Sequence, residues 1–354
     1  MPKILFITVR SDFGGGPRHV DQLVKLLDNN FELYMAYPEN GEPYGLEWEK
    51  NERIIDIFHI PYRKFSLHTL FGLLRFTKKN HIDIVHSHGN GAGLYSRFLK
   101  LMLPQVKVVH TFHGISDEYS SVFKLVASYI IGWILEPLAN IYICVSEGER
   151  KMALKRHFST KNNSIVIYNG IKPPKTRIRM NMGQTIQIAT ISRFDYQKNT
   201  EMTICIAKKV KDLNLKFIII GDGENRMKLE KEAKDNGLNI EFTGFLYDPM
   251  EHLNDADWYI STSRFEGLPY ALIEAASMGI PILATNVKGN NEVVVQNETG
   301  FLFKTVKEAE LLIRHIADRK LDYEHLSNNS RAFFMKNFTT NKMIDKLTSI
   351  YHSL

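Results

Sequence analysis

Short apolar runs rich in β-branched residues alternate with amphipathic stretches along the whole chain. Stretches such as residues 19–30 and 70–80 carry apolar side chains at helical spacing, with charged residues between them. Strands that alternate with helices predict a parallel sheet covered by helices on both faces. In the first half of the chain the strand-like runs are residues 3–9, 31–37, 82–88, 107–113, 140–146 and 164–169.

A second series of the same kind follows residues 172–184, a segment with two prolines, several charges and no periodicity. We interpret that segment as a linker. The sequence therefore predicts an α/β protein with an N-terminal domain at residues 1–171 and a C-terminal domain at residues 185–335. Residues 336–354 are expected to form a helix that packs back towards the N-terminal domain. The strand-like runs of the second series are residues 185–191, 215–221, 240–244, 257–263 and 280–285.

Composition narrows the class of protein. The chain has 354 residues, of which 44% are hydrophobic, so it can build two cores and is not a disordered chain. Its two cysteines, Cys144 and Cys205, cannot form a disulfide framework, which favours a reducing compartment. The apolar start, Ile4 to Val9, is too short for a signal-peptide core. The longest uncharged apolar stretch, Leu125 to Leu135, is far below the roughly 20 residues of a membrane span.

The net positive charge of the chain lies in its N-terminal half. Residues 1–175 hold 22 Lys and Arg against 16 Asp and Glu, whereas residues 176–354 hold 23 of each. Basic residues recur beside Phe65 and Phe71, and such a surface would suit anionic lipid headgroups. The alternative is an ordinary set of amphipathic helices packed on a sheet. No nucleic-acid motif appears, so no nucleic-acid partner is expected.

A glycine cluster, Gly14 to Gly16, follows the first predicted strand and precedes a helix. Glycines let backbone N–H groups approach a phosphate, and a helix N-terminus favours negative charge. The spacing is not the G-x-G-x-x-G of dinucleotide sites. A tight turn without a ligand is the alternative, and the pattern alone leaves both open.

Two cations, Arg193 and Lys198, follow the first strand of the second series. At the carboxyl end of a parallel strand they are placed where a diphosphate would bind. A planar guanidinium and a point-charge ammonium are a usual pair for phosphate oxygens. Two solvated loop charges would give the same pattern.

Two glutamates, Glu266 and Glu274, stand eight positions apart within residues 266–279. Pro269 is expected in the first turn of a helix, and Gly279 just past its end. Beside a helix start that binds an anion, the carboxylates of Glu266 and Glu274 would accept hydrogen bonds from sugar hydroxyls. The alternative is that one glutamate caps the helix and the other lies on the surface. The free N–H groups at that helix start belong to Gly267, Leu268 and Tyr270.

Four histidines, His86, His88, His110 and His113, lie near the ends of two predicted strands. Strand alternation places His86 and His88 on one side, and His113 precedes a glycine at a strand end. A metal site needs three or four ligands and a second shell. We interpret the four as polar strand-end histidines, one or two of which touch substrate. The sequence Asp-Ala-Asp at 255–257 resembles a metal-binding pattern but leads into a strand, so no metal site is predicted.

Together these residues resemble the retaining glycosyltransferases of family 4, which have the GT-B fold. The match runs along the whole chain, and its most specific part is the pair Glu266 and Glu274. The resemblance implies two Rossmann-like doubly wound domains that face a central cleft. The other matching motifs are, in order, Gly15-Gly16 with His19, Thr111-Phe112-His113, Val145-Ser146, Asn169-Gly170, Arg193 with Lys198, Gly221-Asp222-Gly223 and Phe242-Thr243-Gly244.

The resemblance also implies roles for individual residues. Arg193 and Lys198 would hold the donor diphosphate and stabilise it as a leaving group. Glu274 would bind the ribose hydroxyls, and His113 would contact the donor sugar near the reacting centre. The expected catalytic residues are His113, Arg193, Lys198 and Glu266. The remaining donor-binding residues are Gly15 and Gly16 at the phosphate, Phe245 and Leu246 at the base, and Glu266, Gly267, Leu268, Pro269 and Tyr270 at the sugar and distal phosphate.

The implied activity is a retaining hexosyltransferase that uses a nucleotide diphosphate sugar, with UDP as the favoured nucleotide. The acceptor would be a saccharide or a lipid-linked molecule, as in bacterial capsule, lipopolysaccharide or exopolysaccharide assembly. A sugar-nucleotide epimerase of the same fold and a non-catalytic nucleotide-sugar-binding subunit remain as alternatives. No cofactor or metal is expected beside the nucleotide-sugar co-substrate. We expect a cytoplasmic protein, peripheral on the inner face of the plasma membrane through its basic N-terminal domain.

Overall fold

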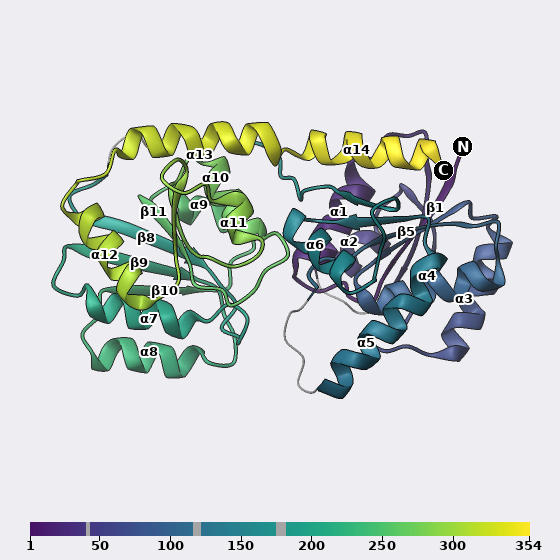
Figure 1. The fold of residues 1–354 in the computed structure, drawn as a ribbon, viewed down its shortest axis with the longest axis horizontal. Helices are drawn as coiled ribbons and strands as arrows, with labels where there is room; N and C mark the ends of the chain where they lie inside the picture. The colour runs from purple at the N-terminus through teal and green to yellow at the C-terminus, as the bar shows by residue number, and fades with distance from the viewer. Residues whose placement is uncertain (40–42, 116–121, 175–181) are drawn as a thin grey trace. The chain divides into compact units, whose positions relative to one another are not determined.

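The computed structural model describes residues 1–39, 43–115, 122–174 and 182–354, and it divides into two compact units (Figure 1). Unit 1 comprises Met1–Asn169 and Thr340–Leu354, and unit 2 comprises Gly170–Thr339. The middle of the expected linker lies outside the described residues. Its flanks, residues 172–174 and 182–184, contain no helix or strand.

Unit 1 contains a seven-stranded sheet in the order β3-β2-β1-β4-β5-β6-β7, and every neighbouring pair is parallel. The predicted parallel α/β architecture is therefore confirmed. The analysis of the sequence missed β3, an edge strand that is only partly buried and whose apolar run is interrupted by Asp56. The strands are β1 (Lys3–Thr8), β2 (Glu32–Tyr37), β3 (Ile54–His59), β4 (Ile84–His88), β5 (Lys107–Thr111), β6 (Ile141–Cys144) and β7 (Ser164–Val166).

Local sequence features explain where helices α3 and α1 of unit 1 begin. Helix α3 begins after Ser66, whose side chain accepts a hydrogen bond from the N–H of Thr69 at 3.3 Å. Helix α1 begins at Gly15, four residues before the start that the periodicity predicts, because the glycines themselves form its first turn. The helices are α1 (Gly15–Leu26), α2 (Tyr44–Glu49), α3 (Leu67–Lys79), α4 (Asn90–Met102), α5 (Val122–Leu135), the 3₁₀ helix η1 (Glu136–Leu138), α6 (Glu147–Lys155) and α14 (Thr340–Ser353).

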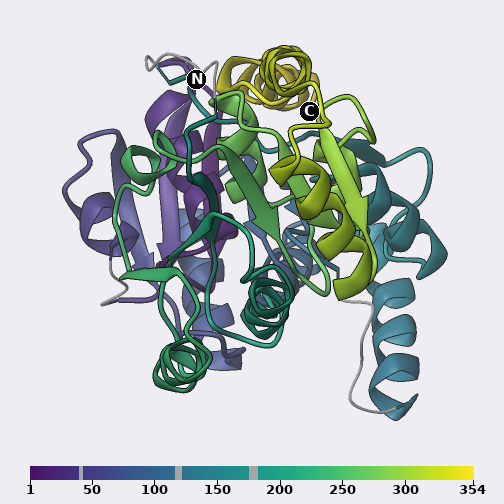
Figure 2. The same ribbon diagram turned by 90° about the vertical axis from the view of Figure 1, so that its left-hand side faces the viewer.

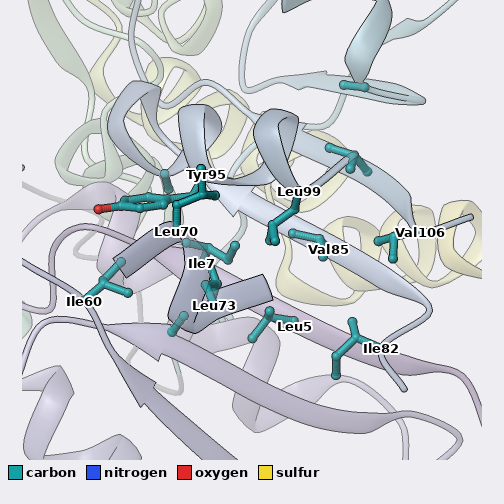
Figure 3. Packing of buried hydrophobic residues seen from close by; sticks show 14 of the residues in the cluster. Leu5, Ile7, Ile60, Leu70, Leu73, Ile82, Val85, Tyr95, Leu99 and Val106 are labelled. Atoms are coloured by element: carbon teal, nitrogen blue, oxygen red, sulfur yellow. The ribbon is translucent and has the colours of Figure 1, made fainter. Parts of the chain in front are cut away.

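The sheet of unit 1 has an apolar core on each face. Along β1, Leu5 and Ile7 belong to one core, whereas Ile4 and Phe6 belong to the other. This follows from the two-residue period of a strand, which sends successive side chains to opposite faces. Figure 3 shows the first core, in which Leu73 of α3 and Leu99 of α4 pack over β1.

The C-terminal helix α14 belongs to unit 1, although it follows unit 2 in the chain. Its apolar side chains are buried in the second core at helical spacing, and Leu347 is fully buried. The chain leaves helix α13 (Tyr323–Asn337) at Phe338, whose carbonyl accepts from the N–H of Ile171 at 2.9 Å. The expected boundary at residue 336 therefore falls in the last turn of α13. The side chains of α14 in the core are Met343, Ile344, Leu347, Ile350 and Tyr351.

Unit 2 repeats the architecture with six parallel strands in the order β10-β9-β8-β11-β12-β13. The short last strand, β13, was also missed from the sequence. The strands are β8 (Ile186–Ile191), β9 (Leu215–Ile220), β10 (Ile240–Gly244), β11 (Trp258–Ser261), β12 (Ile282–Thr285) and β13 (Gly300–Phe303). The helices are α7 (Thr200–Lys209), α8 (Arg226–Asp235), α9 (Met250–Leu253), α10 (Tyr270–Ser277), α11 (Asn290–Val293), α12 (Val306–Ala317) and α13.

Strand order reverses at one point in each sheet. In unit 1 it reverses between β1 and β4, and in unit 2 between β8 and β11. The loops after such a pair leave in opposite directions, which opens a crevice at the carboxyl ends of the strands where ligands bind in this class of sheet. The fold therefore singles out the loops after these four strands.

Among the residues that the structure describes, no helix combines the length and the apolar character needed to cross a membrane.

Candidate functional site

The predicted site residues divide between the two units. Unit 1 holds Gly15, Gly16 and His113, and unit 2 holds all the others. Each group lies at the carboxyl ends of its own sheet.

The loop after β8 presents Arg193 and Lys198 in different environments. The carboxylate of Asp195 accepts a hydrogen bond from the backbone N–H of Lys198 at 2.9 Å, which shapes the turn. Asn199 takes a left-handed conformation with φ of 52°, and its side chain donates to the carbonyl of Thr262 at 3.2 Å. The loop after β8 is thereby attached to the loop after β11, across the point where strand order reverses.

Lys198 and Glu266 form an ion pair at that point. The Lys198 Nζ lies 2.6 Å from the Glu266 Oε1, and the two side chains are 19% and 7% exposed. Ser263 donates from its hydroxyl to the same carboxylate oxygen at 2.8 Å. Gln197 donates to the second oxygen at 3.4 Å and to the carbonyl of Phe265 at 3.1 Å. A charge pair this buried has few rotamers, so the ammonium is fixed in position.

Arg193 differs from Lys198 in exposure. Its guanidinium lies 3.0 Å from the carboxylate of Asp195 and donates to the side-chain oxygen of Gln197 at 3.2 Å. About half of the side chain is in contact with solvent. An exposed guanidinium keeps donors available for an anion, and its planar fork suits two phosphate oxygens.

Two glycines bring the loop after β9 against the loop after β8. Gly221 has φ of 137°, and a Cβ atom there would lie 1.9 Å from the carbonyl oxygen of Ser192. Gly223 packs in the same way against the backbone of Phe194. Only glycine permits this approach, which explains the Gly-Asp-Gly motif and fixes the base of the Arg193 loop.

Helix α10 carries the second glutamate. Pro269 has an extended conformation and precedes the first helical residue, Tyr270, so it stands one position before the first turn that the sequence predicts for it. Glu274 is the fifth residue of the helix and is buried. Gly279 has φ of 71° just past the helix end, as predicted. Leu268 and Tyr270 are buried, whereas Gly267 is partly exposed at the helix start.

The buried carboxylates act on a neighbouring tyrosine. Tyr259 on β11 has a pKa well above its usual value, chiefly because it is buried, and the charges of Glu274 and Glu266 add to the effect. Its hydroxyl also accepts a hydrogen bond from the N–H of Ile191 at 3.0 Å. Both glutamates therefore lie within electrostatic reach of one buried hydroxyl.

The predicted base-binding residues follow β10. Phe245 is 45% exposed, and its ring meets that of Tyr247 edge to face, 5.3 Å between centroids. Leu246 is partly exposed. An exposed aromatic pair at a strand end offers a flat apolar surface for stacking.

In unit 1, the glycine turn lies against His113. A Cβ atom at Gly16 would lie 3.7 Å from the ring of His113, so a side chain at Gly16 would occupy the space beside the imidazole. His113 has φ of 63°, which is unusual for a residue with a side chain. The backbone therefore holds this ring in a specific place at the carboxyl end of β5.

A cluster of imidazoles surrounds His113. Its Nε2 lies 3.0 Å from the Nδ1 of His88, and the ring of His19 meets it edge to face at 4.9 Å. Burial lowers the pKa of His19 to about 4, and burial with neighbouring imidazoles lowers the pKa of His88 and His113 well below the usual value. These rings are therefore neutral at pH 7.

The cluster also defines the residues that could hold a metal. Ligand atoms of His19, His88 and His113 all lie within 4.8 Å of one another, so these three side chains could hold one metal ion. The Nδ1 of His19 lies 3.2 Å from the side-chain oxygen of Asn169, a partner that orients the ring. The prediction that no metal is needed remains a prediction. The Asp-Ala-Asp sequence at 255–257, where no metal site is predicted, makes a structural contact: the Asp257 carboxylate accepts from the N–H of Gln187 at 2.8 Å.

Glu149 fixes the loop that carries His113, and the sequence analysis missed it. Its carboxylate accepts from the backbone N–H groups of Gly114, of Ile115 at 3.1 Å and of Val145 at 2.8 Å. The side chain is fully buried. The signal in the sequence was Ser146 followed three residues later by Glu149, a pattern typical of a helix start, and Ser146 does cap α6.

Two further residues near Glu266 were not predicted from the sequence. Gln197 connects Arg193 with Glu266, and Ser263 donates to Glu266. The Gln197–Glu266 hydrogen bond joins residues 69 positions apart, so no local spacing marks it.

Two family models match consecutive parts of the chain. The model described as Glycosyltransferase Family 4 matches residues 13–174, and the one described as Glycosyl transferases group 1 matches residues 177–333. Together they cover both units.

The chain is similar to curated bacterial glycosyltransferases. It is 27% identical over 309 residues to the Escherichia coli UDP-Gal:alpha-D-GlcNAc-diphosphoundecaprenol alpha-1,3-galactosyltransferase, covering 81% of this chain and 79% of that protein. It is 26% identical over 356 residues to the Staphylococcus aureus capsular polysaccharide biosynthesis glycosyltransferase CapH, covering 97% and 98%. Among solved structures, Anabaena HepE in complex with UDP and glucose has a TM-score of 0.83 at 18% identity, covering all of both chains.

Proposed function

The chain belongs to the family 4 glycosyltransferases and has the GT-B fold, and from this premise we propose that it moves a hexose from a UDP-sugar to a saccharide or lipid-linked acceptor with retention of anomeric configuration. We place this reaction in the assembly of a bacterial surface polysaccharide. Two relatives support the proposal, since one is named for UDP-Gal and a diphosphoundecaprenol acceptor and the other for capsular polysaccharide biosynthesis.

The observation that carries the proposal is the cation pair at the reversal point of unit 2. Lys198 is held by Glu266 at 2.6 Å, and Arg193 stands exposed in the same loop. A nucleotide diphosphate brings negative charge to this place, and the departure of the diphosphate increases it. Preoriented cations stabilise that charge without reorganising during the reaction.

The remaining residues of unit 2 suit the other parts of a nucleotide sugar. We assign Phe245 and Leu246 to the base and Glu274 to the ribose hydroxyls. Glu266 and the backbone N–H groups from Gly267 to Tyr270 are assigned to the sugar and the distal phosphate. The start of α10 supports this last assignment, because the N-terminus of a helix carries a partial positive charge that favours an anion.

In unit 1 we assign Gly15 and Gly16 to the donor phosphate and His113 to the donor sugar. Neutral His113 would donate or accept a hydrogen bond without adding charge. The absence of a side chain at Gly16 leaves the space beside its ring open to a ligand.

The proposed chemical step is a front-face substitution. The bond between the anomeric carbon and the phosphate oxygen breaks, and the acceptor oxygen bonds to the same face of that carbon. The proton of the acceptor hydroxyl passes to the departing phosphate oxygen. No nucleophile from the enzyme is required, so the protein contributes position and positive charge.

We further propose that no metal takes part, because Arg193 and Lys198 supply the positive charge that a metal would otherwise supply. Transfer should then continue in excess EDTA. Loss of transfer in EDTA that returns with one divalent cation would contradict this part of the proposal.

The test of the donor site is a titration of the purified protein with UDP, GDP, ADP, dTDP and CMP, followed by thermal unfolding. A ligand at about 100 times its dissociation constant adds about 2.7 kcal/mol of stability, which gives a measurable shift. We expect a shift with UDP that is lost in Glu274→Gln. A control variant, Glu241→Gln, changes an exposed carboxylate on β10 that pairs with Lys216, and should keep the shift.

Product analysis then tests the reaction. UDP-sugars are incubated with a lipid-linked or saccharide acceptor, and the product is examined for a new glycoside of retained configuration. An epimerised donor without a glycoside would favour the epimerase alternative. Nucleotide binding without turnover of any donor would favour the non-catalytic subunit.

A further inference from the structure

Helix α5 of unit 1 presents an apolar face to solvent. Its described exposed side chains are all large and apolar, with exposed fractions from 49% to 69%. Between Leu125 and Leu135 the sequence has no charged residue. Both views show the helix extending away from the sheet of unit 1 (Figures 1 and 2). The exposed side chains are Val126, Ile130, Ile131, Trp133 and Ile134.

These five side chains share one side of the helix. At 3.6 residues per turn they fall within an arc of about 160°. Gly132 and Leu135 lie on the other side: the ring of Phe158 packs against Gly132, and Leu135 is buried. The helix is therefore attached to unit 1 by one face, and the opposite face is without a partner in the part of the chain that the structure describes.

The sequence analysis placed an apolar basic surface elsewhere, on α3. There Leu70 and Leu73 are buried in the core, whereas Phe71 is 54% exposed. Phe65 stacks on Tyr95 and Phe98, with centroid distances of 4.8 and 5.6 Å. A larger group of exposed apolar side chains lies on α5, which the charge pattern did not single out.

The segment that packs against α5 is basic. Phe158 and Asn163 both contact the α5–η1 region, the second by donating to the Glu136 carboxylate at 2.6 Å. Residues 150–163 contain five Lys and Arg and no Asp or Glu. Lys151, Lys155 and Lys161 of this segment are exposed. The exposed apolar face of α5 and these exposed lysines belong to neighbouring segments, and together they complement a surface that is apolar below and anionic above.

We propose that α5 and the adjoining lysines dock unit 1 on an anionic lipid bilayer. The 14 residues of α5 are fewer than the roughly 20 that cross the hydrocarbon layer, so the helix lies in the interface with its apolar face down. Trp133, the most exposed of the five, is a residue type that favours the headgroup level. The choice of lipid over a protein partner rests in part on the proposed function, since a lipid-linked acceptor is held in a bilayer.

The chain contains its own optical probe for this contact. Of its three tryptophans, Trp48 and Trp258 are fully buried and Trp133 is 69% exposed. Vesicles of phosphatidylglycerol and phosphatidylcholine are added to the purified protein, and tryptophan emission is recorded beside co-flotation. We expect a blue shift and flotation with the anionic vesicles, and little of either with phosphatidylcholine alone. Trp133→Phe should remove the spectral shift and keep most of the flotation.

Charge and apolar variants test the two parts of the surface separately. Ile130→Glu and Ile134→Glu should each lower partitioning about tenfold or more. Lys155→Glu with Lys161→Glu should lower it about 25-fold or more, since each lysine near an anionic surface is worth about fivefold. Leu311→Glu, at a site on α12 that is 52% exposed, is the matched control and should partition like wild type. Thermal unfolding establishes that each variant is folded.

The experiment needs neither donor nor acceptor, so it does not depend on the proposed reaction. Flotation without transfer would leave the docking surface in place and contradict only the function. Transfer to a soluble acceptor without flotation would overturn the docking surface alone. If Ile130→Glu instead dissociates a dimer seen by sedimentation, and wild type does not float, the face joins two copies of the chain and the proposal is wrong.

Discussion

The two units have the same topology and different chemistry at the same place. Each sheet reverses its strand order once, after β1 in unit 1 and after β8 in unit 2. At the reversal in unit 1 the neighbouring side chains are neutral, buried imidazoles around His113. At the reversal in unit 2 they are a fixed ammonium and an exposed guanidinium, Lys198 and Arg193.

This difference shows that the fold gives a location and the loops give the function. A crevice at the ends of parallel strands forms wherever the order reverses. Neutral rings position uncharged groups, whereas cations bind phosphate.

Glu149→Ala should have the largest effect on unit 1. It leaves three backbone N–H groups without their carboxylate, and each unsatisfied buried group costs about 1–3 kcal/mol. We expect a loss of about 3 kcal/mol or more in the free energy of unfolding, measured in urea. Transfer should also fall, because the His113 loop is released. Glu147→Ala, which changes an exposed carboxylate at the start of the same helix, is the control. Equal effects of the two variants would contradict the positioning role.

Lys198→Met should have the largest effect on activity in unit 2. Losing one donor that stabilises the leaving group typically lowers kcat about 10²–10³-fold. The variant also leaves Glu266 buried without its partner, so stability should fall. The double variant Lys198→Met with Glu266→Gln removes both charges and should recover stability without activity. Near-normal transfer by the folded single variant would show that Lys198 does not stabilise the leaving group.

Acid should weaken unit 1 through its histidines. The pKa of His19 falls from about 6.5 in the unfolded chain to about 4 in the folded one, so the unfolded state binds more protons between these values. The contribution of neutral His19 to the free energy of unfolding is fully present above pH 6.5 and is lost as pH falls towards 4. This group alone lowers the free energy of unfolding by about 2 kcal/mol between pH 7 and pH 5. Urea unfolding of Trp258→Phe, in which the remaining tryptophans report unit 1, measures it. His19→Asn should remove this part of the dependence, and a flat wild-type profile would contradict the prediction.

Lys216→Met should have the smallest effect. Its Nζ lies 2.6 Å from Glu241, the same distance as in the Lys198–Glu266 pair, but both side chains are more than a third exposed. Exposed pairs contribute about 1 kcal/mol or less. We expect a change in the free energy of unfolding below about 1 kcal/mol and unchanged transfer. A loss as large as that in Lys198→Met would mean that burial does not distinguish the two pairs.

Much of the fold was predictable because burial leaves a period in the sequence. Eleven of the strands, the parallel architecture and the helix α14 follow from apolar spacing. The strands that were missed, β3 and β13, are edge strands with short or interrupted patterns. Candidate site residues such as Arg193 and Glu266 could be named because they stand on loops that a sequence pattern marks. Gln197 and Glu149 could not be named, because most of their partners are distant in the chain.

Neighbouring positions in the sequence encode the two α/β series, the residues that mark the family and the amphipathic pattern of α14. Only the folded chain shows that Lys198 meets Glu266 across 68 positions and that one face of α5 stays exposed. The physical reason is that a period records whether a side chain is buried but not against what. The partner depends on the order of the strands, which no local pattern contains.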